Sequence, residues 1–338
     1  MKTELFGRLP SGEEVNSYSI SNPSASLSVI NFGATVKSFC PYGTDIVAGF
    51  DSFEHYFEDR SCHGAIVGRV ANRIADAQLN IDGAIHMLSA NQMGNCLHGG
   101  VEGFSRKMWE LIDSSETSLT FSYYSPDGDE GFPGGVLCKV KYSLIEATLI
   151  IEYEATPDSK TAIALTNHAF FNLNGFGETV YDHIARIYAP TYTEVNERLL
   201  PNGNHPSVKG TVYDFSYPKR FGADFTEGFR GHDVNYNLSP ESFKEFCGKS
   251  LGLCAEVVGE RLKMNYYTDQ PGSQLYLANH IGKQPDSPPF SGGRAQVPNG
   301  AFCFESQTEP NCVCRGEAIY DAGEIYRQIT VYEIEKIK

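Results

Sequence analysis

Five short segments of the chain place polar side chains among apolar residues. A polar group in such a position lowers stability unless it is hydrogen-bonded or is used for binding or catalysis. These segments are therefore the first candidates for a functional site. They are residues 68–77 (GRVANRIADA), 96–100 (CLHGG), 164–175 (ALTNHAFFNLNG), 229–238 (FRGHDVNYNL) and 301–310 (AFCFESQTEP).

The last segment offers a carboxylate for acid–base chemistry. Glu305 directly follows the apolar run FCF, and Gln307 lies on the same face if the segment is a strand. An apolar neighbourhood raises the pKa of a carboxyl group toward neutrality, which suits a general base. A solvent-exposed glutamate on an edge strand is the alternative interpretation.

The segment 164–175 offers a matching acid. It reads as a strand that places Asn167 and His168 beside Phe170 and Phe171. An imidazole beside two aromatic rings loses part of its hydration, so nearby charges set its proton affinity. His168 is thus a candidate general acid, and a hydrogen-bonded core histidine is the alternative.

The first two segments carry groups that could bind hydroxyls. Asn72 and Arg73 lie between apolar residues, so one or both should be held against a packed surface, where a guanidinium could fork onto two ligand hydroxyls. The alternative is a structural arginine paired with a carboxylate. Two glycines after His98 allow the backbone to approach a ligand or to turn sharply, and His98 is either a donor to a hydroxyl or a structural histidine.

Asp233 is the candidate in the segment 229–238. It follows His232 and precedes an alternating tail. As an acceptor, its carboxylate could take protons from two vicinal hydroxyls. A turn aspartate that bonds its own backbone would explain the pattern equally well.

The elements that position these residues should be β-strands. Short alternating or β-branched runs recur, turn clusters rich in glycine, proline, asparagine and aspartate separate them, and sustained 3.6-residue periodicity is nearly absent. The class predicted is all-β. The expected strands include residues 119–124, 139–144, 148–154, 161–166, 275–278 and 329–334.

Only two short helices are expected, at residues 53–59 and after Ser239, where Pro240 would occupy the first helical position behind a serine cap. The stretch 281–300 is rich in proline and glycine and predicts a long surface loop. All-β folds often reach 338 residues as one unit, so we expect one domain over residues 1–338.

Composition and charge narrow the ligand class. The chain is 41% hydrophobic and 20% charged, which is typical of a soluble globular protein. Its formal net charge is −15, and it lacks a lysine or arginine run that could neutralise a phosphate backbone or an anionic membrane. We therefore expect a neutral small molecule as partner, with no nucleic acid and no membrane.

Neither a metal nor a redox role is predicted. The nine histidines include no H-x-x-x-H or H-E-x-x-H spacing, and the nearest cysteine pair, Cys312 and Cys314, is only C-x-C. Nine scattered cysteines suggest reduced thiols in a cytoplasmic protein. The N-terminal residues contain no apolar stretch of signal-peptide type, and no segment reaches membrane-spanning length.

Taken together and in this order, the segments resemble the galactose mutarotase (aldose 1-epimerase) family. The resemblance extends from NFGATVKSF at residues 31–39 to about Pro310 and so covers most of the chain. Its motifs are GRVANRIA, LHGG followed by GF and Trp109, SPDGDEGFPG, LTNHAFFNLNG, GHDVNY, PGSQLY and FESQ. Their joint occurrence by chance is negligible.

The resemblance implies an isomerase that interconverts the α and β anomers of free hexoses such as galactose and glucose. It implies Glu305 of the E-x-Q motif as base and His168 of T-N-H as acid. It also implies a single large antiparallel β-sandwich with the site in a groove, no cofactor, no metal, and a monomer or homodimer. The sugar-binding residues implied are Asn72, Arg73, His98, Asp233 and Gln274.

Three residues depart from the family pattern, namely Ala169 after the T-N-H histidine, Leu277 after PGSQLY, and Asn311 after Pro310. They could shift substrate preference. Two other functions remain open at this point. A hexose-6-phosphate 1-epimerase would need extra cationic groups for the phosphate, and an inactive sugar-binding protein would keep the groove without the acid and base.

Overall fold

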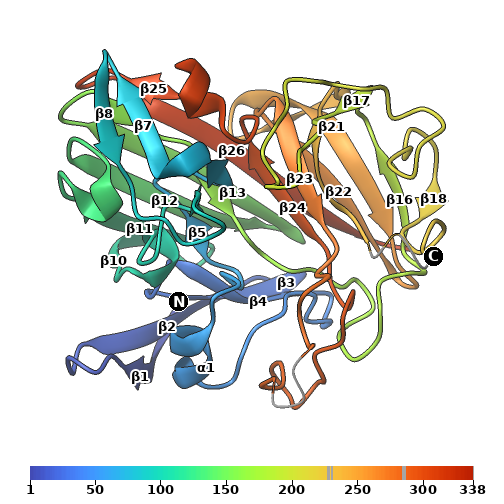
Figure 1. The fold of residues 1–338 in the computed structure, drawn as a ribbon. Coiled ribbons are helices and arrows are strands. Elements are labelled where there is room, and N and C mark those ends of the chain that lie inside the picture. The colour runs from blue at the N-terminus through green and yellow to red at the C-terminus, as the bar shows by residue number, and fades with distance from the viewer. Residues whose placement is uncertain (227–228, 230, 284–286, 338) are drawn as a thin grey trace.

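The largest element of the fold is a ten-stranded sheet that crosses the molecule (Figure 1). The computed structural model describes residues 1–226, 229, 231–283 and 287–337. In spatial order the strands are β10 (Glu110–Ser114), β11 (Ser118–Ser125), β12 (Val136–Ile145), β13 (Thr148–Pro157), β26 (Tyr326–Lys336), β22 (Leu262–Thr268), β21 (Lys249–Val258), β16 (Ile184–Ile187) and β18 (Lys219–Arg220), and β20 (Glu241–Phe246) also pairs with β21.

Two four-stranded sheets pack against the large sheet. The first contains β1 (Lys2–Arg8), β2 (Glu14–Ser21), β3 (Ala25–Ile30) and β4 (Thr35–Pro41). The second contains, in spatial order, β17 (Thr191–Tyr192), β19 (Asp233–Asn237), β23 (Gly272–Tyr276) and β24 (Cys303–Gln307). One hydrophobic cluster joins all three sheets, so the fold is the predicted large antiparallel β-sandwich.

Four short strand pairs complete the structure. They are β5 (Ile66–Val67) with β15 (Thr166–Asn167), β6 (Arg73–Ile74) with β9 (Cys96–Leu97), β7 (Gln78–Ile81) with β8 (Ala84–Met87), and β14 (Thr161–Ala162) with β25 (Ile319–Tyr320). In the described part of the chain the helices are α1 (Phe53–Glu58) and the 3₁₀ turns Ala75–Ala77, Phe104–Arg106, Asp129–Gly131 and Cys312–Arg315. No helix among these residues is long and apolar enough to cross a membrane.

The alternation of side chains in the long strands explains why this chain forms a sandwich. In β12, Val136, Cys138 and Val140 are buried in the shared core, whereas Leu137 and Lys141 on the opposite face are exposed. Successive residues of a strand point to opposite faces, so such a strand buries one face against a second sheet. The strands predicted at 119–124, 139–144, 148–154 and 329–334 are confirmed within β11, β12, β13 and β26.

The helix predicted after Ser239 is wrong. Residues Glu241–Phe246 form β20, which pairs with β21. Cys247 and Gly248 join the two strands, and both have positive φ angles, 50° and 76°, as a tight type I′ hairpin turn requires. A six-residue helix would be marginal alone, so pairing with β21 outweighs the local capping signal. The helix predicted at 53–59 is confirmed as α1.

Two predicted strands are shorter than expected. The segment 161–166 divides into β14 and β15, because Ala164 between them exchanges backbone hydrogen bonds with Arg69 and Ala71 instead. The segment 275–278 ends as a strand at Tyr276, and Ala278 has a left-handed φ of 50°. Residues 281–283 and 287–300 form neither a named strand nor a helix, which agrees with the predicted loop.

Candidate active site

Strand β24 places Glu305 on the face opposite to the core. Phe304 packs into the core, where its ring stacks on Tyr266 at 4.9 Å and its carbonyl oxygen accepts a hydrogen bond from the Tyr332 hydroxyl. Because strand residues alternate, Cys303 and Glu305 must point the other way. Glu305 is only 2% exposed although β24 is the edge strand of its sheet, so the alternative of a solvent-exposed glutamate is wrong.

The register of the same sheet brings two further predicted residues to that face. Gln274 of β23 lies directly opposite Glu305, and Asp233 of β19 lies opposite Tyr276. The Gln274 side-chain nitrogen donates to an Asp233 carboxylate oxygen at 2.6 Å. Asp233 is therefore held by a neighbouring strand, and its side chain makes no bond to its own backbone among the described contacts.

His168 directly follows β15 and is held by backbone pairing. Its N–H donates to the carbonyl oxygen of Ala65, and its own carbonyl accepts from the N–H of Gly64, each at 2.9 Å. The ring packs against Phe170 with the ring centres 4.8 Å apart. The predicted apolar neighbourhood of this histidine is thus present, and the residue is 6% exposed.

Asn72 precedes β6 and His98 follows β9, and their two backbones are hydrogen-bonded to each other. Both have left-handed backbones, with φ angles of 61° and 53°, which is uncommon for residues other than glycine and concentrates at functional sites. Two hydrogen bonds hold the two residues together: the His98 N–H donates to the Asn72 carbonyl oxygen, and the Asn72 N–H donates to His98 Nδ1. Gly99 packs so closely that a Cβ there would lie 1.8 Å from the Gly68 carbonyl oxygen.

Arg73 is the first residue of β6 and is buried. Its Nη1 donates to the Asn72 side-chain oxygen at 3.2 Å and its Nε donates to Gln92 at 2.6 Å. It forms no ion pair within the described part of the chain, so the alternative of a carboxylate-paired structural arginine is not supported. Its Nη2 has no protein partner there either, which leaves one donor nitrogen for a ligand.

All seven predicted site residues line one cavity of about 200 Å³. They come from two strand pairs, β6–β9 and β5–β15, and from the sheet that contains β19, β23 and β24, and the fold brings them together. Among the other lining residues, Leu97, Phe170 and Tyr276 lie inside segments that carry a sequence signal, whereas Arg60, Ser61, Gln92 and His280 lie in turns and loops that carry none. The seven are Asn72, Arg73, His98, His168, Asp233, Gln274 and Glu305, and the others are Arg60, Ser61, Gln92, Leu97, Phe170, Tyr276 and His280.

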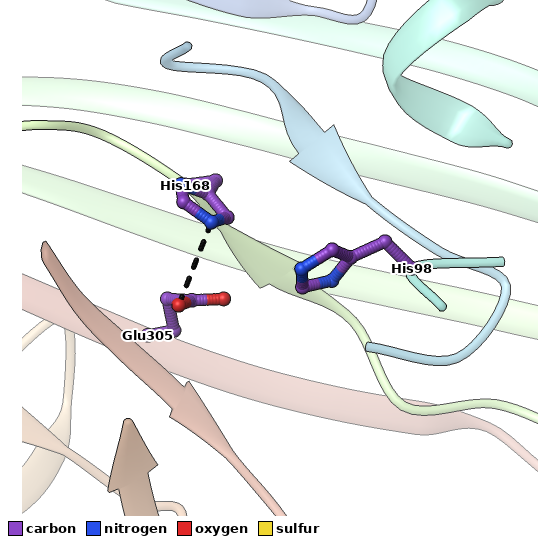
Figure 2. A group of neighbouring side chains, drawn as sticks. All are labelled: His98, His168 and Glu305. Atoms are coloured by element: carbon purple, nitrogen blue, oxygen red, sulfur yellow. Dashed lines mark ion pairs between the residues drawn. The ribbon is translucent and has the colours of Figure 1, made fainter. Parts of the chain in front are cut away.

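Glu305 and His168 face each other inside this cavity. The Glu305 Oε1 atom lies 3.6 Å from His168 Nε2, and a dashed line marks this pair in Figure 2. The second oxygen of Glu305 has no hydrogen-bond partner among the described residues. Burial, reinforced by the negative charge of Asp233, raises the pKa of Glu305 to about 8, although Arg73 opposes this rise. Burial lowers the pKa of His168 to about 4. Groups perturbed in this way are typical of acid–base sites.

The surroundings of His98 fix the tautomer of its ring. Burial of the ring, together with the smaller effects of the neighbouring His168 and Arg73, lowers the pKa of His98 well below its ordinary value, so the ring is neutral near pH 7. Its Nδ1 accepts a backbone N–H, so its single ring proton must be on Nε2. His98 is thus fixed as a donor, which suits a sugar hydroxyl.

Distance alone would allow a metal ion between His98, His168 and Glu305, whose possible ligand atoms lie within 4.8 Å of one another (Figure 2). A histidine ligates a metal through an unprotonated ring nitrogen. The Nε2 of His98 carries the proton because Nδ1 is already an acceptor. These residues therefore fit a hydroxylated ligand better than a metal ion.

Comparisons with known proteins identify the family. The family profile described as Aldose 1-epimerase matches residues 16–333. The chain belongs to the aldose 1-epimerase family. It is 35% identical to human galactose mutarotase over 324 residues, which cover 91% of this chain and 90% of that protein. It is 31% identical to the aldose 1-epimerase of Escherichia coli K12 over 302 residues, which cover 86% and 84% of the two chains.

Solved structures of family members share the fold. A GalM/aldose epimerase homologue from C. elegans superimposes with a TM-score of 0.86 at 26% identity, covering 96% of this chain and all of the other. Galactose 1-epimerase from Lactobacillus acidophilus gives a TM-score of 0.85 at 24% identity, covering 100% and 99%. These likenesses agree with the antiparallel sandwich of Figure 1.

The three departures from the family pattern do not line the cavity. Ala169 and Leu277 are buried in the hydrophobic core. Asn311 accepts the backbone N–H of Ala75 at 2.9 Å and so connects two loops. A direct effect of these residues on the bound ligand is therefore not expected.

Proposed function

We propose that this protein is a mutarotase that interconverts the α and β anomers of free hexoses such as galactose and glucose. The observation that carries the proposal is the buried pair of Glu305 and His168, 3.6 Å apart, in a cavity lined with hydroxyl-binding side chains. Ring opening removes a proton from the C1 hydroxyl and adds one to the ring oxygen, so it needs one base and one acid.

In this mechanism Glu305 takes the proton of the C1 hydroxyl while His168 protonates the ring oxygen. The product is the open-chain aldehyde, which rotates about the C1–C2 bond and recloses on its other face with the roles of the two residues reversed. The pair carries one proton before and after each step. The pKa values of about 8 and about 4 predict that the pair holds one proton between these limits, mainly on Glu305 in the free enzyme. Ring opening as written starts from the minor form in which this proton has moved to His168, and reclosure returns the pair to that form.

The remaining cavity residues would hold the sugar while C1 rotates. We assign Nη2 of Arg73 and Nε2 of His98 as donors, and Asp233 as an acceptor for hydroxyl protons. Asn72 and Gln274 bond each other at 3.3 Å and would complete the hydroxyl-binding set. Holding the opened chain near the acid and base avoids the entropic cost of finding it again.

A neutral sugar suits this cavity better than a hexose 6-phosphate. Two arginines line the cavity, and one of them, Arg60, is 3.6 Å from Glu102 at the protein surface. The carboxylates of Asp233 and Glu305 also face the cavity. The other arginine, Arg73, forms no ion pair among the described residues but is assigned to the sugar hydroxyls, so no arginine of the described lining is left for a phosphate group.

Polarimetry of freshly dissolved α-galactose, α-glucose and glucose 6-phosphate tests this function. The wild type should hasten the decay of optical rotation for the free sugars. Glu305→Gln and His168→Asn should each lose about 10²- to 10⁴-fold in rate, because each removes one proton transfer. Glu152→Gln, on the outer face of β13, should behave as the wild type. If the wild type does not hasten the decay, the proposed function is refuted. If Glu305→Gln and His168→Asn are as active as the wild type, the assignment of these two residues is refuted.

We propose one domain over residues 1–338, supported by the family match over 16–333 and by the core cluster that joins the three sheets. We propose a cytoplasmic location, supported by nine cysteines that are all free thiols. A monomer or homodimer is proposed, and gel filtration with light scattering tests it.

A further inference from the structure

We propose that Cys303 is a positioning residue for His168. The Nδ1–H of His168 donates a hydrogen bond to the Cys303 sulfur, which leaves Nε2 of the same ring to exchange a proton with the sugar. This inference rests on the proposed role of His168 as the acid. It adds a residue that the chemistry itself does not require, because Cys303 does not line the cavity.

The geometry places the thiol on the far side of the imidazole from the reacting groups. The Cys303 sulfur lies 3.7 Å from His168 Nδ1, whereas the other ring nitrogen faces Glu305 at 3.6 Å. Cys303 is fully buried, and alternation in β24 puts it on the same face as Glu305. One strand therefore supplies both the base and the second contact of the acid.

The direction of this hydrogen bond follows from the reaction. When His168 gives the Nε2 proton to the ring oxygen, a neutral imidazole remains, and its one proton must then be on Nδ1. A group that accepts from Nδ1 throughout the cycle keeps the ring in this tautomer. The carbonyl oxygen of His168 itself also raises the pKa of the ring, against the larger effect of burial, and a carbonyl can act only as an acceptor.

A sulfur atom is a suitable partner because it is a weak acceptor without charge. Burial, reinforced by Glu305 and Asp233, raises the pKa of the Cys303 thiol well above its ordinary value, so it stays protonated and neutral. A carboxylate at this position would stabilise the imidazolium and make it a weaker acid. The thiol fixes the ring while leaving the proton easy to transfer.

Other ionisable groups also face His168, and any pH effect must be judged against them. His63 and Asp59 act on its pKa in opposite directions, the first lowering and the second raising it. The rings of His98 and Tyr276 lie 5.4 and 6.3 Å away, centre to centre. None of these four contacts Nδ1 in the described hydrogen bonds, so a change at Cys303 acts on this nitrogen alone.

Nitrogen-15 NMR of histidine-labelled protein tests the tautomer without any catalysis. The His168 signals are assigned by their loss in His168→Asn. Near pH 7 the wild type should show a protonated Nδ1 and an unprotonated Nε2. A proton on Nε2 of the neutral ring would overturn the inference, even if the polarimetric assay confirms the enzyme.

Variants at Cys303 give a second test, in which the direction of the His168 pKa shift distinguishes a positioning role from a purely structural one. Cys303→Ser offers a stronger acceptor, so the His168 pKa and the acid limb of kcat/KM should move to higher pH. Cys303→Ala removes the sulfur and leaves only the His168 carbonyl oxygen as acceptor, so both should move to lower pH, and kcat should fall about tenfold with KM changed less than about twofold. The matched control is Cys254→Ala, because this fully buried thiol bonds only backbone carbonyls. Shifts of both Cys303 variants in the same direction, or none beyond the control, contradict the inference.

Discussion

Replacing Asp233 by asparagine should move the basic limb of the pH–rate profile to lower pH. Burial and then the charge of Asp233 raise the pKa of Glu305 from 4.5 to about 8. This rise corresponds to about 5 kcal/mol of destabilisation of the carboxylate relative to the protonated acid, at about 1.4 kcal/mol for each tenfold change. Asparagine keeps a similar shape and removes the like charge.

The expected size of this change is limited because burial is the larger cause and remains in the variant. We expect the basic limb to move down by about one pH unit, the scale of a single charged neighbour. Arg73 acts in the opposite sense, since its positive charge lowers the pKa of Glu305. Arg73→Gln should therefore move the same limb upward. The absolute rates of both variants should also fall, because both residues are assigned to hold the sugar.

The assay is kcat/KM for α-galactose by polarimetry from about pH 5 to pH 9.5, because this ratio reports ionisations of the free enzyme. The wild type should be bell-shaped, with limbs near the pKa values of about 4 and about 8. Asp113→Asn, an exposed substitution on β10, is the control for loss of one surface charge. If Asp233→Asn leaves the basic limb in place or moves it upward, the electrostatic account of Glu305 is wrong.

Two other outcomes concern stability. The pKa of Glu305 is higher in the folded than in the unfolded state, so the folded wild type loses stability as pH rises from about 4.5 through about 8. Over this range Glu305→Gln should therefore become more stable relative to the wild type, by up to about 5 kcal/mol. A difference in the free energy of unfolding that does not change with pH, measured by urea melts, would contradict this. Gly99→Ala should cost at least about 2 kcal/mol and raise KM, because its Cβ would meet the Gly68 carbonyl. Its control is Gly83→Ala, which has a similar φ of +86° in open space; equal losses in the two variants would show that the backbone angle alone is responsible.

The parts of the fold that sequence predicted are those where local pattern and tertiary packing agree. In β12 and β13 the alternation of apolar and polar residues matches a two-sided sheet, so the strands were predictable. The stretch after Ser239 contains a serine and a proline that favour a helix start, yet it pairs with β21 instead. That choice depends on a partner strand next in the chain, which a capping rule does not include.

The predicted site residues meet in one cavity, but their sequence patterns did not reveal how. Glu305 and Gln274 become neighbours only through the register of β23 and β24. Gln92 holds Arg73 from a polar turn that carries no sequence signal. The donor state of His98 depends on a single backbone N–H, that of Asn72, so no composition or spacing rule could have found it.

The position of the base follows from the same packing that forms the core. Phe304 and its contacts with Tyr266 and Tyr332 fix one face of β24 against the large sheet. The next residue along the strand must then point into the cavity, where it loses its water and its pKa rises. A side chain on a loop could reach the same place but would keep more hydration and more freedom. The aromatic core under β24 thus determines both where Glu305 lies and how strongly it binds a proton, which links the acid–base chemistry directly to the sandwich.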